Sequence, residues 1–241
     1  MSDQEHKDVW TPINGYEWPV PIPKDADLNH IQIEMLNFGA QYVWLDVLCL
    51  RQAGGKREDL CREEWKVDVP TIGAIYHEAK VVYYLSGLGH PFCLKLGDLE
   101  SDQCWFRCAW TLQEVSCDYI IGGVTGNHWM DEDMQTRCDG QLQSLQNMRD
   151  QSMWYILSQM QNRMSTKPLD KVAGLAYFLS KKSIPIYNEA QSEEDVWVAL
   201  TEVMFEMYCV ELLFSYPEPG NGQTLATIME SDNGNAIYIT Y

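Results

Sequence analysis

This chain has few basic residues and no long apolar run. Its 241 residues include 17 Lys and Arg against 35 Asp and Glu, which gives a formal net charge of −18. Because nucleic acids and anionic membranes are polyanions, this charge argues against either as a partner. No run approaches the roughly 18 apolar residues of a membrane span, and residues 1–10 lack the apolar stretch of a signal peptide. We therefore expect a cytoplasmic protein with no membrane span and no nucleic-acid partner.

Several motifs that mark metal, nucleotide and hydrolase sites are also absent. The eight cysteines form no C-x-x-C pair and match no common zinc spacing, so we predict no metal site and mostly buried, reduced thiols. The glycines of 122–126 suggest a phosphate loop but lack its G-K-[S/T] ending, and there is no G-x-S-x-G. The sequence therefore carries no strong local signature of catalysis.

The apolar pattern, by contrast, is that of a folded α/β domain. Hydrophobic residues make up 46% of the chain. Their spacing predicts an ordered loop or edge segment over 11–25, helices over 27–39, 70–79, 105–117, 142–164, 167–180 and 195–213, strands over 42–50, 81–86 and 119–123, and a strand-like tail, IYITY. Strands that alternate with helices indicate βαβ units and a parallel sheet. We expect one domain over 1–241, with an α/β core over about 27–135 and a helical part over about 136–215.

A carboxylate interrupts the first predicted strand. Asp46 stands in the middle of YVWLDVLCL (42–50), and burial of its charge costs free energy unless the group is paired or hydrogen-bonded. One interpretation is a structural aspartate held by backbone amides or by a neighbouring Arg or Trp. The other is a ligand-facing carboxylate at the carboxyl ends of parallel strands, where open α/β sheets bind ligands. Arg51 and Gln52 follow on the same predicted rim.

The predicted helix over 105–117 carries a second candidate site. At 100° per residue, one of its faces gathers a guanidinium, an indole, a hydroxyl and a carboxylate: Arg107, Trp110, Thr111 and Glu114. Such a face is suited to a pocket wall, and a carboxylate beside a tryptophan can acquire a raised pKa and act as a base. The alternative is an ordinary amphipathic helix with one exposed tryptophan.

Three blocks of sequence occur in the order and spacing of a known family. Block 1 is 42–52 (YVWLDVLCLRQ), like the family's W-I-D-x-L-C-I-N-Q; block 2 is 107–114 (RCAWTLQE), like R-x-W-T-x-Q-E; block 3 is 170–176 (DKVAGLA), like R-D-K-V-Y-A-L-L-G-L. Together they resemble the fungal heterokaryon-incompatibility (HET) domain over roughly residues 10 to 210. The resemblance implies a non-self recognition module that triggers programmed cell death through a protein partner or self-association.

The HET domain is thought to be a distant relative of the Toll/interleukin-1 receptor (TIR) fold, which implies a parallel sheet of flavodoxin-like strand order. Many TIR domains that cleave NAD carry a W-x-x-x-E helix with a catalytic glutamate, and 110–114 has this spacing. By this resemblance, Glu114 would stabilise the oxocarbenium-like charge as the nicotinamide–ribose bond of NAD breaks. Asp46, Arg51 and Gln52 would line the same crevice, with NAD as the substrate and no cofactor.

The chain also departs from the family pattern. The family pattern begins with an aromatic-rich strand, which is expected before the proline-rich segment 11–25 and is not found there. In block 1, Leu-Arg-Gln at 50–52 replaces the commoner Ile-Asn-Gln. Three functions stay open: a death-signalling interaction module, an NAD glycohydrolase, and an inactive fragment or degenerate family member.

Overall fold

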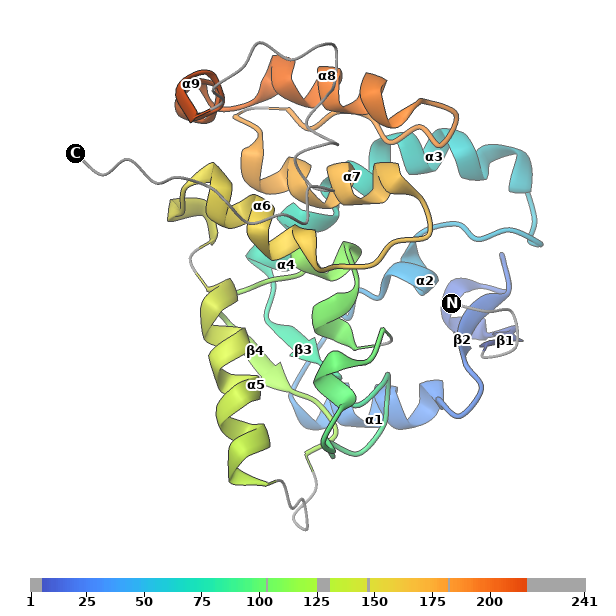
Figure 1. Ribbon diagram of the computed structural model, residues 1–241. Helices are drawn as coiled ribbons and strands as arrows, with labels where there is room; N and C mark the ends of the chain where they lie inside the picture. The colour runs from blue at the N-terminus through green and yellow to red at the C-terminus, as the bar shows by residue number, and fades with distance from the viewer. Residues whose placement is uncertain (1–5, 103, 125–130, 147, 182, 216–241) are drawn as a thin grey trace.

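The protein is a mixed α/β structure in which helices predominate (Figure 1). The computed structural model describes residues 6–102, 104–124, 131–146, 148–181 and 183–215. Two small sheets lie in this part of the chain: β1 (His6–Val9) pairs antiparallel with β2 (Val20–Pro23), and β3 (Val81–Tyr83) pairs parallel with β4 (Tyr119–Ile121). The helices are α1 (Leu28–Asn37), α2 (Asp46–Cys49), α3 (Cys61–Asp68), α4 (Ile72–Glu78), α5 (Glu132–Leu145), α6 (Met153–Gln161), α7 (Pro168–Leu179), α8 (Glu193–Val203) and α9 (Glu206–Ser215).

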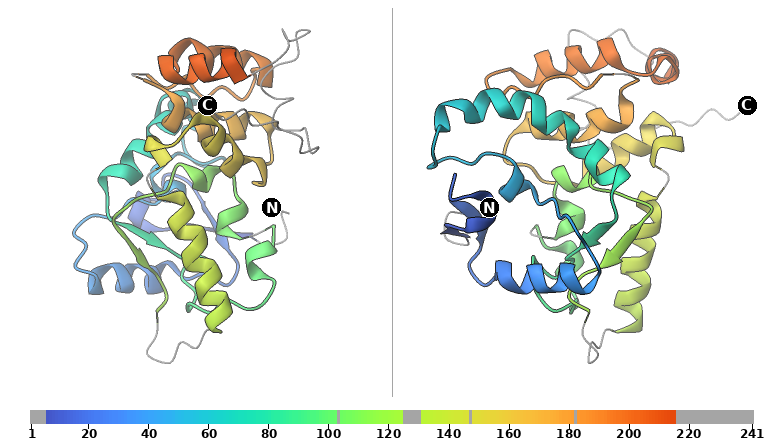
Figure 2. Two further views of the ribbon diagram at one scale, coloured as in Figure 1. Left: turned by 60° about the vertical axis from the view of Figure 1, so that its left-hand side comes forward. Right: turned by 180° about the vertical axis from the view of Figure 1, so that it is seen from behind.

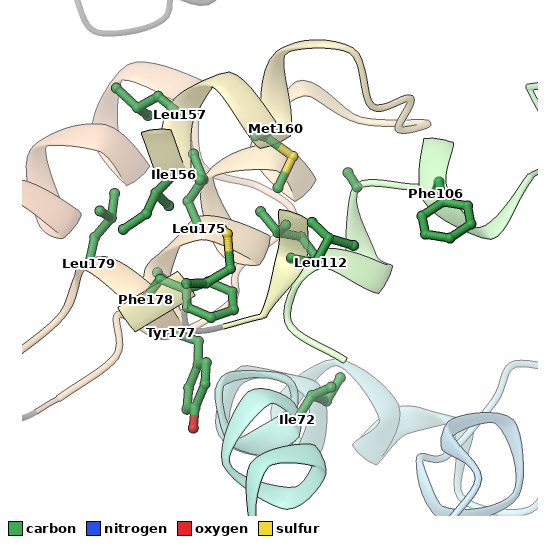
Figure 3. Packing of buried hydrophobic residues seen from close by; sticks show 14 of the residues in the cluster. Ile72, Phe106, Leu112, Ile156, Leu157, Met160, Leu175, Tyr177, Phe178 and Leu179 are labelled. Atoms are coloured by element: carbon green, nitrogen blue, oxygen red, sulfur yellow. The ribbon is translucent and has the colours of Figure 1, made fainter. Parts of the chain in front are cut away.

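The helices gather at the two ends of the molecule. Helices α6, α7, α8 and α9 lie together at one end, and the β3–β4 sheet lies with α1 and α5 toward the other (Figures 1 and 2). One apolar cluster nevertheless spans both ends, from Val81 in the sheet to α7. Figure 3 shows part of it, with Leu112 beside Leu175 of α7. A second, smaller cluster joins β2 to α1 through Ile22 and Ile31.

Several helices begin and end where the sequence predicts. The Asp27 side chain accepts a hydrogen bond from Asn29 N at 2.8 Å and so caps α1, which ends shortly before Gly39 in the left-handed region at φ +78°. Helix α4 follows a 3₁₀ turn that contains Pro70, and α7 has Pro168 at its first position. The helices predicted over 27–39, 70–79 and 167–180 are thus confirmed.

The parallel pairing of the two later strands is confirmed as well. The strands predicted over 81–86 and 119–123 form β3 and β4, in register from Val81 opposite Tyr119 to Tyr83 opposite Ile121. The parallel sheet has no third strand among the described residues, so a TIR-like core of flavodoxin-like order is not confirmed.

The strand predicted over 42–50 is wrong. Its second half forms the short helix α2, and Leu50 N donates to Asp46 O at 2.7 Å instead of to a neighbouring strand. The run is largely apolar because most of it passes between two cores, whereas Tyr42 and Val43 at its start are exposed. Its side chains divide between them: Trp44 and Leu50 pack with the larger cluster, and Leu45, Val47 and Leu48 with the smaller. Burial on both sides, which usually indicates a strand in a parallel sheet, here has another cause.

The helix predicted over 105–117 is also wrong. The segment forms two 3₁₀ turns, η5 (Trp105–Arg107) and η6 (Trp110–Leu112), with Cys108 in an extended conformation between them. Ala109 N donates to Met164 O at 2.8 Å, and Met164 N donates to Arg107 O. These bonds to a distant segment replace the i to i−4 bonds of an α-helix, so tertiary contacts override the local pattern.

The two longest predicted helices are each divided. The stripe over 142–164 belongs to α5 and α6, because Ser152 interrupts it and its hydroxyl caps α6 by accepting from Tyr155 N at 3.3 Å. The helix over 195–213 splits into α8 and α9, because Phe205 N turns to Leu179 O at 3.0 Å. Helix α3 is not among the predicted helices, and the tail IYITY lies outside the described residues.

Candidate functional site

Glu114, the last residue of block 2, is half-buried and hydrogen-bonded. Its Oε2 accepts from Trp105 Nε1 at 2.9 Å, and its backbone carbonyl accepts from Tyr83 Oη at 3.1 Å. Burial, and secondly the Asp46 carboxylate, raise the pKa of Glu114 to about 7, against the opposing effects of the Trp105 bond and the Arg163 charge. Glu114 therefore populates both its protonated and its ionised form near neutral pH, as a general acid or base requires.

Asp46 and Tyr76 share this desolvated region. Asp46 begins α2, and its Oδ1 accepts from Val47 N at 2.7 Å; burial raises the pKa of this carboxyl and the bond to Val47 lowers it. Burial raises the pKa of the Tyr76 phenol well above its ordinary value, and the charges of Glu114 and Asp46 raise it further. The structure thus brings the predicted residues Asp46 and Glu114 close enough for the Asp46 charge to raise the pKa of Glu114, and for both charges to raise the pKa of Tyr76.

Arg163, on the segment after α6, holds block 2 in place. Only 3% of it is exposed. Its Nη1 donates to Cys108 O at 2.8 Å and to Thr111 Oγ1 at 2.7 Å, and its Nε donates to Gln159 O at 3.0 Å. Burial lowers the pKa of Arg163 to about 10, although the nearby Cys108 and Glu114 favour its charge. Thr111, which we expected in a pocket wall, is instead buried and accepts one of the hydrogen bonds by which Arg163 holds block 2.

Trp110 joins block 2 to block 3. Its ring meets the Tyr187 ring edge-on, with centroids 5.5 Å apart. Tyr187 Oη in turn donates to Asp170 Oδ1 at 2.8 Å, and Lys167 N donates to Asp170 Oδ2 at 3.2 Å. Burial raises the pKa of Asp170, and its bonds, that from Tyr187 first, lower it. Asp170 is therefore both an anchor for Tyr187 and a cap for the start of α7.

The other predicted ligand residues of block 1 point elsewhere. Arg51 donates from Nε to Glu64 Oε2 at 2.8 Å, lies 3.7 Å from Glu17 Oε2, and places its guanidinium 5.1 Å from the centroid of the Trp18 ring. Gln52 Nε2 donates to Leu50 O at 2.8 Å. Neither contact reaches Glu114, so the structure does not join Arg51 and Gln52 to the Glu114 region.

Arg107, at the start of block 2, is half-buried with weak charge pairing. Its nearest carboxylate is Asp102, 3.8 Å from Nη2, and its buried Nε has no hydrogen-bond partner among the described residues. Its one ion pair in this part of the chain is thus with Asp102 and not with Glu114. The W-x-x-x-E spacing of 110–114 begins on the 3₁₀ turn η6 and ends in the turn that follows it, and Trp110 and Glu114 contact different neighbours.

Blocks 1, 2 and 3 nevertheless meet in space, and we call this region the block junction. The Asp46 carboxylate of block 1 lies near enough to Glu114 of block 2 to raise its pKa, and Trp110 of block 2 contacts the Tyr187 ring that Asp170 of block 3 anchors. Gly174 of block 3 lies so near block 2 that a Cβ built on it would be 2.8 Å from the carbonyl oxygen of Ala109. Segments far apart in the sequence thus build one site.

Sequence reasoning misses four residues of this junction: Trp105, Tyr76, Arg163 and Tyr187. The sequence pattern places Trp105 on the core face of a helix that does not form. Arg163 and Tyr187 lie outside all three blocks, in segments without regular secondary structure, and a single arginine or tyrosine there gives no pattern. Arg163 stands among the mostly polar residues of 161–167, so its charge gives no local signal of its role.

No protein-family model, curated protein or solved structure matches this chain. Within the described ranges, no helix is both long enough and apolar enough to cross a membrane. In the same part of the chain, no cluster of His, Cys, Asp and Glu is arranged to hold a metal ion.

Proposed function

We propose that this chain is a module of the HET type, which triggers programmed cell death on non-self recognition through a protein partner or self-association. The block junction carries the proposal. The three blocks that resemble the HET domain are far apart in the sequence, and they converge on one region through Asp46, Trp110, Glu114 and Asp170. Convergence is what we expect if the three blocks serve one site. In this proposal, β3 and β4 are part of a TIR-like sheet.

Induced expression in a fungal host tests this function. The full chain should reduce the number of viable cells, and a chain that leaves viability unchanged at equal protein level would contradict the proposal. Glu114→Gln asks whether the junction is responsible, because Gln keeps an oxygen acceptor for Trp105 and removes the charge. Glu132→Gln, an exposed position on α5, is the matched control.

A second candidate function is hydrolysis of the nicotinamide–ribose bond of NAD, which the environment of Glu114 favours. The Glu114 carboxylate is desolvated and lies near a second carboxylate, Asp46. As the C–N bond breaks and nicotinamide leaves, an ionised Glu114 would stabilise the positive charge that develops on the ribose, and water would then add to the anomeric carbon. The Trp105 hydrogen bond would fix the carboxylate, and the desolvated region that Tyr76 shares would limit its contact with water.

Release of nicotinamide by the purified chain tests this candidate. Since the ionised form of Glu114 is required, the rate should rise with pH through an apparent pKa near 7. Glu114→Gln should lower the rate by about 100-fold or more, whereas Glu132→Gln should leave it unchanged. Turnover that survives Glu114→Gln would contradict the role of Glu114, and cell killing without turnover would favour the interaction module.

A further inference from the structure

An open cleft borders the block junction on the side of α3. Its volume is about 590 Å³, in the range of clefts that hold a drug-sized ligand or a short peptide segment. Residues from three parts of the chain line it: the loop after block 1, helix α3 and the segment before α8. The residues of the Glu114 region, Asp46, Tyr76, Trp105 and Glu114, do not line this cleft, so it is a separate site.

Two aromatic side chains form part of the cleft wall, Trp65 and Tyr187. Their ring centroids are 6.4 Å apart and the ring planes are inclined by 48°. The polar atom of each ring is already bonded inside the protein: Trp65 Nε1 donates to Arg51 O at 2.7 Å, and Tyr187 Oη donates to Asp170 Oδ1 at 2.8 Å. Both rings are therefore held in place by these hydrogen bonds, and what they offer to a ligand is their apolar and π surface.

All three blocks hold these rings. Trp65 bonds to Arg51 in block 1, and Gln52 of the same block lines the cleft. Tyr187 bonds to block 3 through Asp170 and meets block 2 through Trp110. A ligand in this cleft would consequently contact the outer side of the region that the three blocks build.

The charges around the cleft are mostly negative. Four carboxylates, those of Glu58, Asp59, Glu63 and Glu189, line it against one guanidinium, that of Arg62. The thiol of Cys61 reports the resulting potential. Burial raises its pKa first, the charges of Glu64 and Glu58 raise it next, and the opposing effect of Arg51 is smaller than either.

The carboxylates of the cleft remain available to a cationic ligand. Three of them form ion pairs with neighbouring cations: Asp59 with Arg57 (3.2 Å), Glu63 with Lys66 (2.7 Å) and Glu189 with Lys167 (2.6 Å). The side chains of these carboxylates are 39% to 66% exposed, and ion pairs at exposed sites contribute little to stability. A guanidinium or ammonium group that also contacts an aromatic face can displace such weak partners.

We propose that this cleft binds a basic segment of a partner protein, with an Arg or Lys side chain against Trp65 and between the carboxylates of Glu58, Asp59 and Glu63. The proposal names the chemistry of the partner and rests on the proposed function as an interaction module. An open cleft admits an extended segment, aromatic rings beside carboxylates recognise a cationic head group, and the net charge of −18 attracts basic partners over long range.

Binding of a labelled peptide to the full chain tests the proposal. The probe is a fluorescein-labelled nonapeptide with three arginines, measured by fluorescence anisotropy at about physiological ionic strength, where long-range attraction between exposed charges is screened. The cleft variant is Glu58→Gln/Asp59→Asn/Glu63→Gln. The control variant is Glu132→Gln/Asp133→Asn/Asp139→Asn, which removes the same charge from exposed positions on α5. Circular dichroism verifies that both variants are folded.

The cleft variant should bind the peptide at least tenfold more weakly than the wild type, and the control variant should stay within twofold. An equal loss in both variants would mean that the peptide responds only to net charge, and it would overturn the site. Absence of wild-type binding would overturn it too, as would displacement of the peptide by spermidine at equal molar concentration. The viability test remains separate. A chain that binds the peptide at the cleft and does not kill cells supports the cleft site and contradicts the cell-death function. A chain that kills cells without binding the peptide supports the cell-death function and contradicts the cleft site.

Discussion

Glu114 and Arg163 place opposite charges in one desolvated region, without a salt bridge between them in the described residues. Each responds as a buried charge does. The pKa of Glu114 is raised to about 7 and that of Arg163 is lowered to about 10, chiefly by burial in both cases. Arg163 keeps its charge at neutral pH, whereas Glu114 is only partly ionised. The junction therefore contains one fixed charge and one that responds to pH.

Glu114→Gln should make the protein more stable at high pH and leave it unchanged at low pH. The pKa of Glu114 is about 7 when folded and 4.5 ordinarily, so the folded state binds more protons between these values. Its contribution to the free energy of unfolding therefore falls as pH rises from about 4.5 to 7, by at most about 1.4 kcal/mol per pH unit. Urea unfolding of both proteins at pH 4.5 and 8 measures the difference, with Glu132→Gln as the control. A difference that does not depend on pH would contradict the burial of this carboxyl.

Arg163→Met should raise the pKa of Glu114, because the Arg163 charge favours its ionised form. The substitution also removes the donor that Cys108 O and Thr111 Oγ1 share, which should cost about 2–4 kcal/mol of stability. Carbon-13 NMR of the Glu114 carboxyl measures the pKa. Arg163→Lys keeps the charge and should leave the pKa near that of the wild type, so an equal rise in both variants would argue against an electrostatic role.

At the scale of elements, the sequence predicts what local signals determine and misses what distant contacts impose. Helix α1 follows from the Asp27 cap, and the β3–β4 pair follows from two short buried runs. The 3₁₀ turns of 105–112 depend on bonds to Met164 and Arg163, and no local pattern contains them. The same holds for the site. Asp46 and Glu114 stand out as carboxylates in apolar surroundings, whereas Trp105, Tyr76 and Arg163 join them only through the fold.

Two glycine substitutions should have opposite effects on stability. Gly174 lies in α7 where a Cβ would be 2.8 Å from Ala109 O and 3.0 Å from Met160 Cε, and the backbone oxygen cannot move away cheaply. Gly174→Ala should therefore destabilise the protein, by about 1–3 kcal/mol for overpacking of this kind. At Gly140 in α5, a Cβ would meet no described atom within 4 Å, so Gly140→Ala should stabilise by about 0.5–1 kcal/mol. Thermal unfolding of both variants measures these effects. A Gly174→Ala variant as stable as the wild type would contradict the close contact of blocks 2 and 3.

At the scale of the whole molecule, one apolar cluster fixes the three blocks relative to one another. Leu50 in block 1, Leu112 in block 2 and Leu175 in block 3 all belong to it, and Figure 3 shows the latter two. The block junction is therefore built on the core of the protein. The charges of the protein surface lie outside this core. A net charge of −18 and a carboxylate-rich cleft next to the junction together favour a basic partner.

The central claim is that this chain acts as a module that triggers cell death. Its most direct test is the number of surviving colonies after induced expression of the full chain in a fungal host, compared with expression of Glu132→Gln at equal protein level. We expect survival to fall by at least tenfold in both cases, relative to uninduced cells. Full survival of cells that express the folded wild-type chain would contradict the claim.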